Sequence, residues 1–193
     1  MTDTVTAPAP TTAHVVNGID LSALGEFVEE VKADPSKATV AFRVTTRWSG
    51  QTRSETTIDG YELAGRPIDR RFKVIADEPV ELLGTDTAPI PQELLMTALN
   101  ACMAVGYVAQ AAVHGIALDT LEIETRGQLD LRGFLGLDES IPPGYRQLDY
   151  TVRIGGGGTA EQFREIHQAV MKTSPNFFNL NQPICMNGRL EVV

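Results

Sequence analysis

The sequence has few of the residues that hold metal ions or build disulfide frameworks. Its 193 residues include two cysteines, Cys102 and Cys185, and three histidines. Two cysteines far apart in the chain cannot form the disulfide framework of a small secreted protein, and the scattered histidines show no spacing typical of a zinc site. We therefore expect a cytoplasmic protein that has no metal and no other cofactor.

Positive charge is also scarce. Lysine and arginine number 16 against 25 aspartates and glutamates, which gives a formal net charge of −9. This negative charge is spread through the chain rather than collected in a tail. Such a balance argues against nucleic acid or an anionic membrane surface as a partner, and it favours solubility.

The first residues lack the features of a secretory signal. The stretch from Met1 to about Ala13 is rich in Thr, Ala and Pro, and it has neither a basic start nor an apolar centre. We predict that residues 1–16 form a flexible leader and that residues 17–193 form one domain. Within it, residues 17–88 hold an N-terminal helix and sheet, and residues 89–193 hold a central helix, two strands, a second helix and a closing strand.

The most apolar segment is Pro91–His114, which has apolar residues on every side of a helix. Polar residues such as Glu93 and Asn100 interrupt it, so no apolar run is long enough to span a bilayer. A helix that is apolar all round must be enclosed by protein, at the centre of a domain or between subunits. Cys102, near its middle, is therefore expected to be buried, as a small core residue or as a reactive thiol.

Residues rich in β-branched and aromatic side chains predict an antiparallel sheet in the N-terminal half. An amphipathic helix over Asp20–Lys32 precedes it, with Asp20 as the N-terminal cap and Pro35 beyond its end. The predicted strands are Thr39–Trp48, Thr52–Ile58 and Phe72–Ile75, with turns at Ser49–Gln51 and Asp59–Gly60.

After the central helix, the pattern predicts two antiparallel strands, a helix and a final strand. These elements are Leu118–Leu131, Tyr145–Ile154, Thr159–Lys172 and Arg189–Val193. The long connection Gly133–Gly144 carries the apolar residues Phe134, Leu135 and Leu137 and is typical of a loop at a binding surface. The whole order predicts an α+β fold in which antiparallel sheets pack on two helices.

Two segments resemble the signature of the OsmC/Ohr family, the osmotically inducible and organic hydroperoxide resistance proteins. They are Phe72–Pro79, which reads FKVIADEP, and Gly84–Cys102, which reads GTDTAPIPQELLMTALNAC. The later order of two strands, a helix, a Ser174-Pro175 step and a closing strand also matches. The resemblance implies an OsmC-like fold in which antiparallel sheets wrap around two central helices, and an intertwined homodimer.

The resemblance also implies a chemistry for Cys102. Family members with peroxidase activity use a helix cysteine to attack a hydroperoxide and a second cysteine to resolve the sulfenic acid. An arginine and a glutamate hold the thiolate. Cys102 falls on the attacking position, and Glu93 matches the broader acidic pattern. The alternative role for Glu93 is a carboxylate that stabilises the start of the helix.

A thiolate in an apolar pocket needs a cation, because burial alone favours the neutral thiol. Arg47, just before the first predicted turn, is the candidate, and Arg53 is the second choice. The alternative interpretation of both is an arginine exposed on a strand.

The sequence departs from the family pattern at two places. Gln92 stands where the Ohr-type members have their acidic residue, one position before Glu93. The Cys-Pro step that supplies the resolving cysteine is Ser174-Pro175 here, and a serine cannot resolve a sulfenic acid. Cys185 is the only other thiol, either a possible second thiol or a small buried residue.

These features predict a homodimeric thiol-dependent peroxidase that reduces organic hydroperoxides, with a dithiol as the reductant. The alternative is a non-catalytic OsmC-like dimer that binds a small hydrophobic ligand, in which the peroxidase cycle is lost because of Ser174. A third possibility is a purely structural dimer. Retention of Cys102 and Arg47 favours the enzyme, and the missing Cys-Pro step favours the ligand-binding alternative.

Overall fold

The computed structural model describes residues 14–193, and residues 1–13 of the predicted leader lie outside the described part. The fold begins before residue 17, because β1 (Val15–Val16) already pairs with β2 (Ile19–Asp20). Helix α1 (Leu21–Ala33) starts, as predicted, at Asp20, whose carboxylate accepts hydrogen bonds from the backbone N–H groups of Ser22 and Ala23. The short 3-10 helix η1 (Pro35–Ala38) leads into the sheet.

The N-terminal sheet is antiparallel, as predicted, but its strands differ from the prediction. It consists of β3 (Val40–Phe42), β4 (Thr45–Trp48), β5 (Ser54–Leu63) and β6 (Arg66–Ala76). Strands β3 and β4 share one edge of β5, and β6 pairs with the other edge along its whole length. The single strand predicted over Thr39–Trp48 is therefore interrupted, and the strands predicted around Thr52–Ile58 and Phe72–Ile75 are longer.

The predicted turn at Asp59–Gly60 is wrong, because both residues lie inside β5. Gly60 follows a shift in register, and a Cβ atom there would come within 2.5 Å of the Ile68 carbonyl oxygen. The glycine thus permits a close approach of two strands. The chain turns instead at Ala64 and Gly65, whose φ angles of 51° and 73° are those of a tight hairpin connection.

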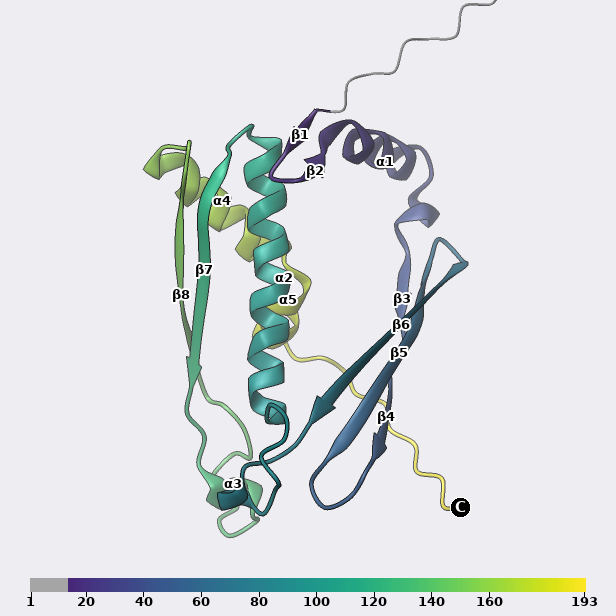
Figure 1. Ribbon diagram of the computed structural model, residues 1–193, viewed down its shortest axis with the longest axis vertical. Helices are drawn as coiled ribbons and strands as arrows, with labels where there is room; N and C mark the ends of the chain where they lie inside the picture. The colour runs from purple at the N-terminus through teal and green to yellow at the C-terminus, as the bar shows by residue number, and fades with distance from the viewer. Residues whose placement is uncertain (1–13) are drawn as a thin grey trace, which may run out of the picture.

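Helix α2 (Pro91–Val113) is the central element, as predicted. His114 caps its C-terminal end, and Gly115, with a φ of 68°, follows the cap. One face of α2 packs against α4 (Ala160–Thr173) and the antiparallel pair β7 (Leu118–Gly127) and β8 (Leu148–Gly156). Figure 1 shows β7 and β8 along one side of α2, whereas the β3–β6 sheet diverges from it. The buried core is made up of Leu99, Met103, Tyr107, Ala111, Ala112, Ile116, Ile166 and Val170.

Three predictions for the C-terminal half need correction. Strand β7 ends at Gly127 rather than at Leu131, because Asp130 caps a short helix, α3 (Leu131–Phe134). The final strand predicted at Arg189–Val193 is wrong: residues 183–193 form no regular structure and are exposed. Helix α5 (Pro175–Asn181) was not predicted, and it begins at the Ser174-Pro175 step.

One argument against membrane insertion also needs correction, namely that no apolar run is long enough to span a bilayer. By length and composition alone, α2 could cross a bilayer. The core helix of a globular domain passes the same test, and the buried face of α2 supplies much of the core described above. We therefore assign α2 as a core helix, one that this chain encloses on one side only.

The loop between β6 and α2 is built around the carboxylate of Asp77, which is fully buried. Its oxygens accept hydrogen bonds from the hydroxyl groups of Thr52, Thr85 and Thr87 and from the backbone N–H groups of Thr85 and Thr87. These bonds, Thr85's above all, hold the pKa of Asp77 well below its usual value. The loop that delivers the chain to Pro91 is thereby fixed by one ionised side chain.

Candidate functional site

Cys102 lies in the middle of α2 and is half-buried, not fully buried as predicted. Its Sγ accepts two hydrogen bonds from the junction of α4 and α5. The Ser174 hydroxyl lies 3.4 Å from the sulfur, and the backbone nitrogen of Asn176 lies 3.5 Å from it. The sulfur therefore faces polar donors on one side, although the helix that carries it is largely apolar.

The α4–α5 junction is held in place by several other bonds. Ser174 is 5% exposed, and its backbone N–H donates to the carbonyl oxygen of Val170 at 2.8 Å. Its hydroxyl oxygen also accepts from the Phe177 N–H and so caps α5. The side-chain amide of Asn176 donates to the carbonyl oxygen of Ala98, on α2, at 2.8 Å. The segment that carries the donors to Cys102 is therefore hydrogen-bonded to α2, the helix that carries the thiol.

Arg47, the predicted cation, does not meet Cys102 within this chain. It lies exposed on β4, opposite Glu55 of β5. Together with Phe42, Tyr61 and Ile68, it lines a hollow of about 500 Å³ in the N-terminal sheet. Arg53, the second choice, is less exposed and its guanidinium lies 3.4 Å from the carboxylate of Glu55. Neither arginine is brought to the thiol by the fold of one chain.

Glu93 occupies the first turn of α2, and its carboxylate accepts a hydrogen bond from the backbone N–H of Ile90 at 3.1 Å. At the usual helical rise it lies about 14 Å along the axis from Cys102. In this chain the hydrogen bond to Ile90 holds the Glu93 carboxylate at the start of α2, and a role at the thiol stays a prediction.

Cys185, the possible second thiol, is exposed in the irregular C-terminal segment, and both cysteines are free. Within residues 14–193 the structure contains no group of three or more His, Cys, Asp or Glu side chains that could hold a metal ion.

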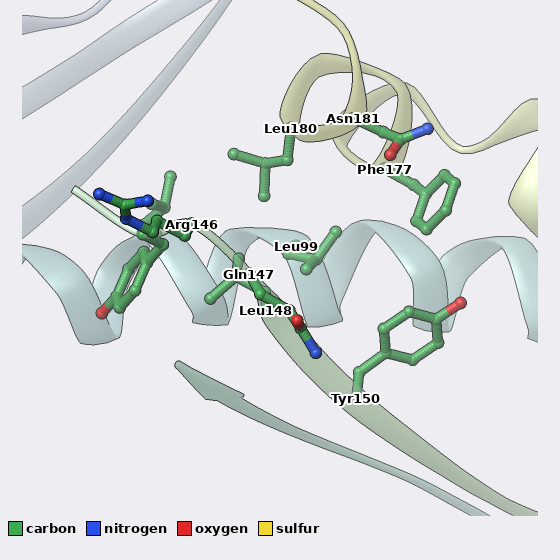
Figure 2. Close-up of a pocket in the computed structure, with 10 residues that line it drawn as sticks. Leu99, Arg146, Gln147, Leu148, Tyr150, Phe177, Leu180 and Asn181 are labelled. Carbon is green, nitrogen blue, oxygen red and sulfur yellow. The ribbon is translucent and has the colours of Figure 1, made fainter. Parts of the chain in front are cut away.

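An open cavity of about 490 Å³ lies between α2, α5 and the start of β8. Figure 2 shows Leu99 on α2 at its floor, with Phe177 and Leu180 from α5 on one side and Leu148 and Tyr150 from β8 on the other. Leu95, Tyr145, Arg146, Gln147 and Asn181 complete the lining. The sequence prediction missed this cavity, because it depends on α5 and on contacts between distant segments.

A buried polar pair lies on the core side of α2. The hydroxyl of Tyr107, which is fully buried, forms a 2.5 Å hydrogen bond with Nδ1 of His167 on α4. Burial raises the pKa of the Tyr107 hydroxyl above its ordinary value, so the phenol stays protonated. No local sequence pattern indicates this pair, because 60 residues separate its members.

Comparisons with known proteins place this arrangement in a family. The sequence model of a family described as OsmC-like protein matches residues 84–187. A search of curated proteins gave no match.

Solved structures of OsmC-like proteins resemble this chain to different degrees. An OsmC like protein from Mycoplasma pneumoniae is 17% identical, with a TM-score of 0.54 over 72% of this chain and 86% of that one. An OsmC-like protein of unknown function from Vibrio cholerae O1 biovar eltor is 12% identical, with a TM-score of 0.55 over 70% and 90%. An OsmC-like hydroperoxide resistance protein from Jannaschia sp. CCS1 is 19% identical over 79% and 93%, with a TM-score of 0.43. The first two likenesses confirm the α+β fold of antiparallel sheets and helices.

Proposed function

The chain belongs to the OsmC-like protein family, and from this membership we propose that it is a thiol-dependent peroxidase that reduces organic hydroperoxides, with Cys102 as the nucleophile. The observation that carries the proposal is the setting of the sulfur. Cys102 is half-buried and faces two hydrogen-bond donors, Ser174 and Asn176. Donors to sulfur favour the thiolate, which is the nucleophilic form of cysteine.

The reaction proceeds through a sulfenic acid. The Cys102 thiolate attacks the outer oxygen of the hydroperoxide, so that an S–O bond forms and the O–O bond breaks. The alkoxide takes a proton and leaves as the alcohol, while the sulfur loses two electrons. A dithiol then restores the thiol: one of its sulfurs displaces water to form a mixed disulfide, and its second sulfur releases Cys102.

We further propose that the active protein is a homodimer in which the hollow beside Arg47 receives α2 of a second copy. On α2, Ala98, Ala101 and Val105 are exposed and recur at helical spacing, and Val105 is 71% exposed. Phe42, in the lining of the hollow, is 75% exposed. Exposed apolar surfaces of this kind indicate contact with another protein. The arrangement gives Arg47 a route to the Cys102 of the second copy.

The peroxidase proposal is tested by following consumption of cumene hydroperoxide in the presence of dithiothreitol. The wild-type protein should consume it, and the Cys102→Ser variant should not. Cys185→Ser is the matched control and should retain the wild-type rate. A reagent that traps sulfenic acids should label Cys102 in the wild type. Equal consumption by the wild type and Cys102→Ser would reject the enzymatic function.

A second function, binding of a small hydrophobic ligand without turnover, is favoured by the cavity between α2, α5 and β8. Its lining combines aliphatic and aromatic side chains with the guanidinium of Arg146. Fluorescence of anilinonaphthalene sulfonate, an aromatic anion, should report binding there. This function predicts that Cys102→Ser binds the probe as the wild type does and that Leu180→Arg does not. Binding by Leu180→Arg at wild-type affinity would exclude the cavity.

A further inference from the structure

We propose that Ser174 is a positioning residue for Cys102 and that it makes the protein a one-cysteine peroxidase. This inference rests on the proposed function and concerns the second half of its cycle. The Ser174 hydroxyl occupies the place from which a second thiol would attack, holds the sulfur by a hydrogen bond, and leaves the oxidised sulfur to a thiol from outside the protein.

The geometry of the pair carries the first step. Oγ of Ser174 and Sγ of Cys102 lie 3.4 Å apart, although 72 residues separate them in the chain. The Ser174 oxygen accepts from the Phe177 N–H, which leaves its own proton to donate to the sulfur. Because Ser174 is 5% exposed, water competes little for this bond.

The second step concerns what these donors can and cannot do. A hydroxyl and a backbone N–H stabilise a thiolate, and they can equally donate to the oxygen of a sulfenate. Neither supplies the thiol that converts a sulfenic acid to a disulfide. Cys185 lies in the exposed C-terminal segment, away from regular structure. The oxidised sulfur is therefore held in place and left unresolved by the residues packed against it.

A thiol from outside the protein completes this cycle, and a small monothiol serves in place of the dithiol. Its sulfur attacks the sulfenic sulfur of Cys102, water leaves, and a mixed disulfide forms. A second monothiol molecule attacks the sulfur of the first, which releases the Cys102 thiol and yields the oxidised dimer of the reductant. Two thiols lose one electron each, which balances the two electrons gained by the hydroperoxide. The half-buried state of Cys102 leaves part of its surface open to such a molecule.

Two variants test the role of Ser174. The first separates its hydrogen bond to the sulfur from its role as a helix cap. Glycine keeps most of the capping effect and has no hydroxyl. Ser174→Gly should therefore fold, but iodoacetamide should alkylate its Cys102 about threefold to tenfold more slowly at neutral pH, the loss expected for one hydrogen bond. The pH profile of alkylation should move to higher pH. A profile identical to that of the wild type would overturn the inference.

Ser174→Cys tests the geometry directly. After one equivalent of cumene hydroperoxide without reductant, mass spectrometry should find a disulfide between Cys102 and the introduced thiol in this variant. The wild type should instead carry a sulfenic acid that dimedone traps, and 2-mercaptoethanol should convert it to a mixed disulfide. A Cys102–Cys185 disulfide in high yield in the wild type would overturn the inference. An inert wild type in the peroxide assay would reject the proposed function, whereas the alkylation profile of Ser174→Gly would still report on the hydrogen bond.

Discussion

Thr85 donates to the buried carboxylate of Asp77 through both its hydroxyl and its backbone N–H. The two residues close the loop between β6 and α2, and therefore help to set where the helix of Cys102 begins. Asp77 belongs to the segment Phe72–Pro79, which is part of the family resemblance. Its hydrogen bonds to Thr85 give one structural reason for an aspartate at this position.

The ionised state of Asp77 predicts sensitivity to acid. Its folded pKa is lowered, so its contribution to stability is present above the usual carboxylate pKa of 3.8 and is lost as the pH falls from there toward the folded value. Asp77→Asn should unfold at a clearly lower temperature than the wild type at pH 7, and the gap should narrow below about pH 4. Asp86→Asn, an exposed position in the same loop, is the control. Thermal unfolding curves between pH 3 and 7 give the unfolding temperatures of the wild type and of both variants. A difference between the wild type and Asp77→Asn that stays constant across this range would contradict the prediction.

The central helix was predictable because its signals are local. Proline at the first position, a long apolar run and a glycine just beyond the end mark both of its boundaries. The turn at Ala64 and Gly65 was missed for the opposite reason. Ala64 adopts a positive φ, which a sequence does not indicate for alanine, whereas Asp59-Gly60 has the composition of a turn and lies in a strand.

The candidate site was only partly predictable. Cys102 and the Ser174-Pro175 step were identified through the resemblance, but their direct contact depends on how α4 and α5 pack on α2. No local pattern encodes that packing. The cavity beside Leu99 was missed in the same way, since its lining comes from three separate segments. The strand expected at Arg189–Val193 has suitable residues, but within residues 14–193 no strand pairs with it.

The Tyr107–His167 pair should contribute to stability. Tyr107→Phe removes the hydroxyl and leaves Nδ1 of a half-buried histidine without its partner, which should lower the free energy of unfolding by about 1–3 kcal/mol. Tyr145→Phe, at a half-buried tyrosine whose hydroxyl makes no such side-chain bond, should change it by less than about 0.5 kcal/mol. Urea denaturation at neutral pH compares the two, and equal effects would show that the buried hydrogen bond contributes little.

The exposed side of α2 provides a test of the homodimer. Val105 is 71% exposed in one chain, so Val105→Glu costs little if the protein is a monomer. In the proposed dimer it buries a charge against a second copy and should dissociate or unfold the protein. Sedimentation at micromolar concentration should show a dimer for the wild type and its loss for the variant. Val80→Glu, at an exposed valine in the loop before α2, is the control. A folded wild-type monomer would contradict the prediction.

Arg47 should act on the thiol of a second copy rather than on its own. If its guanidinium reaches Cys102 across the dimer, Arg47→Ala should slow alkylation of Cys102 about tenfold at neutral pH, because an adjacent cation favours the thiolate. Arg53→Ala, which removes a guanidinium already paired with Glu55, should leave the rate unchanged. Mixing Arg47→Ala with Cys102→Ser gives a sharper test. Heterodimers formed by exchange would contain one Cys102 facing an intact Arg47, so alkylation should recover toward the wild-type rate in that fraction. A rate that stays at the level of Arg47→Ala alone would show that this arginine does not act across the interface.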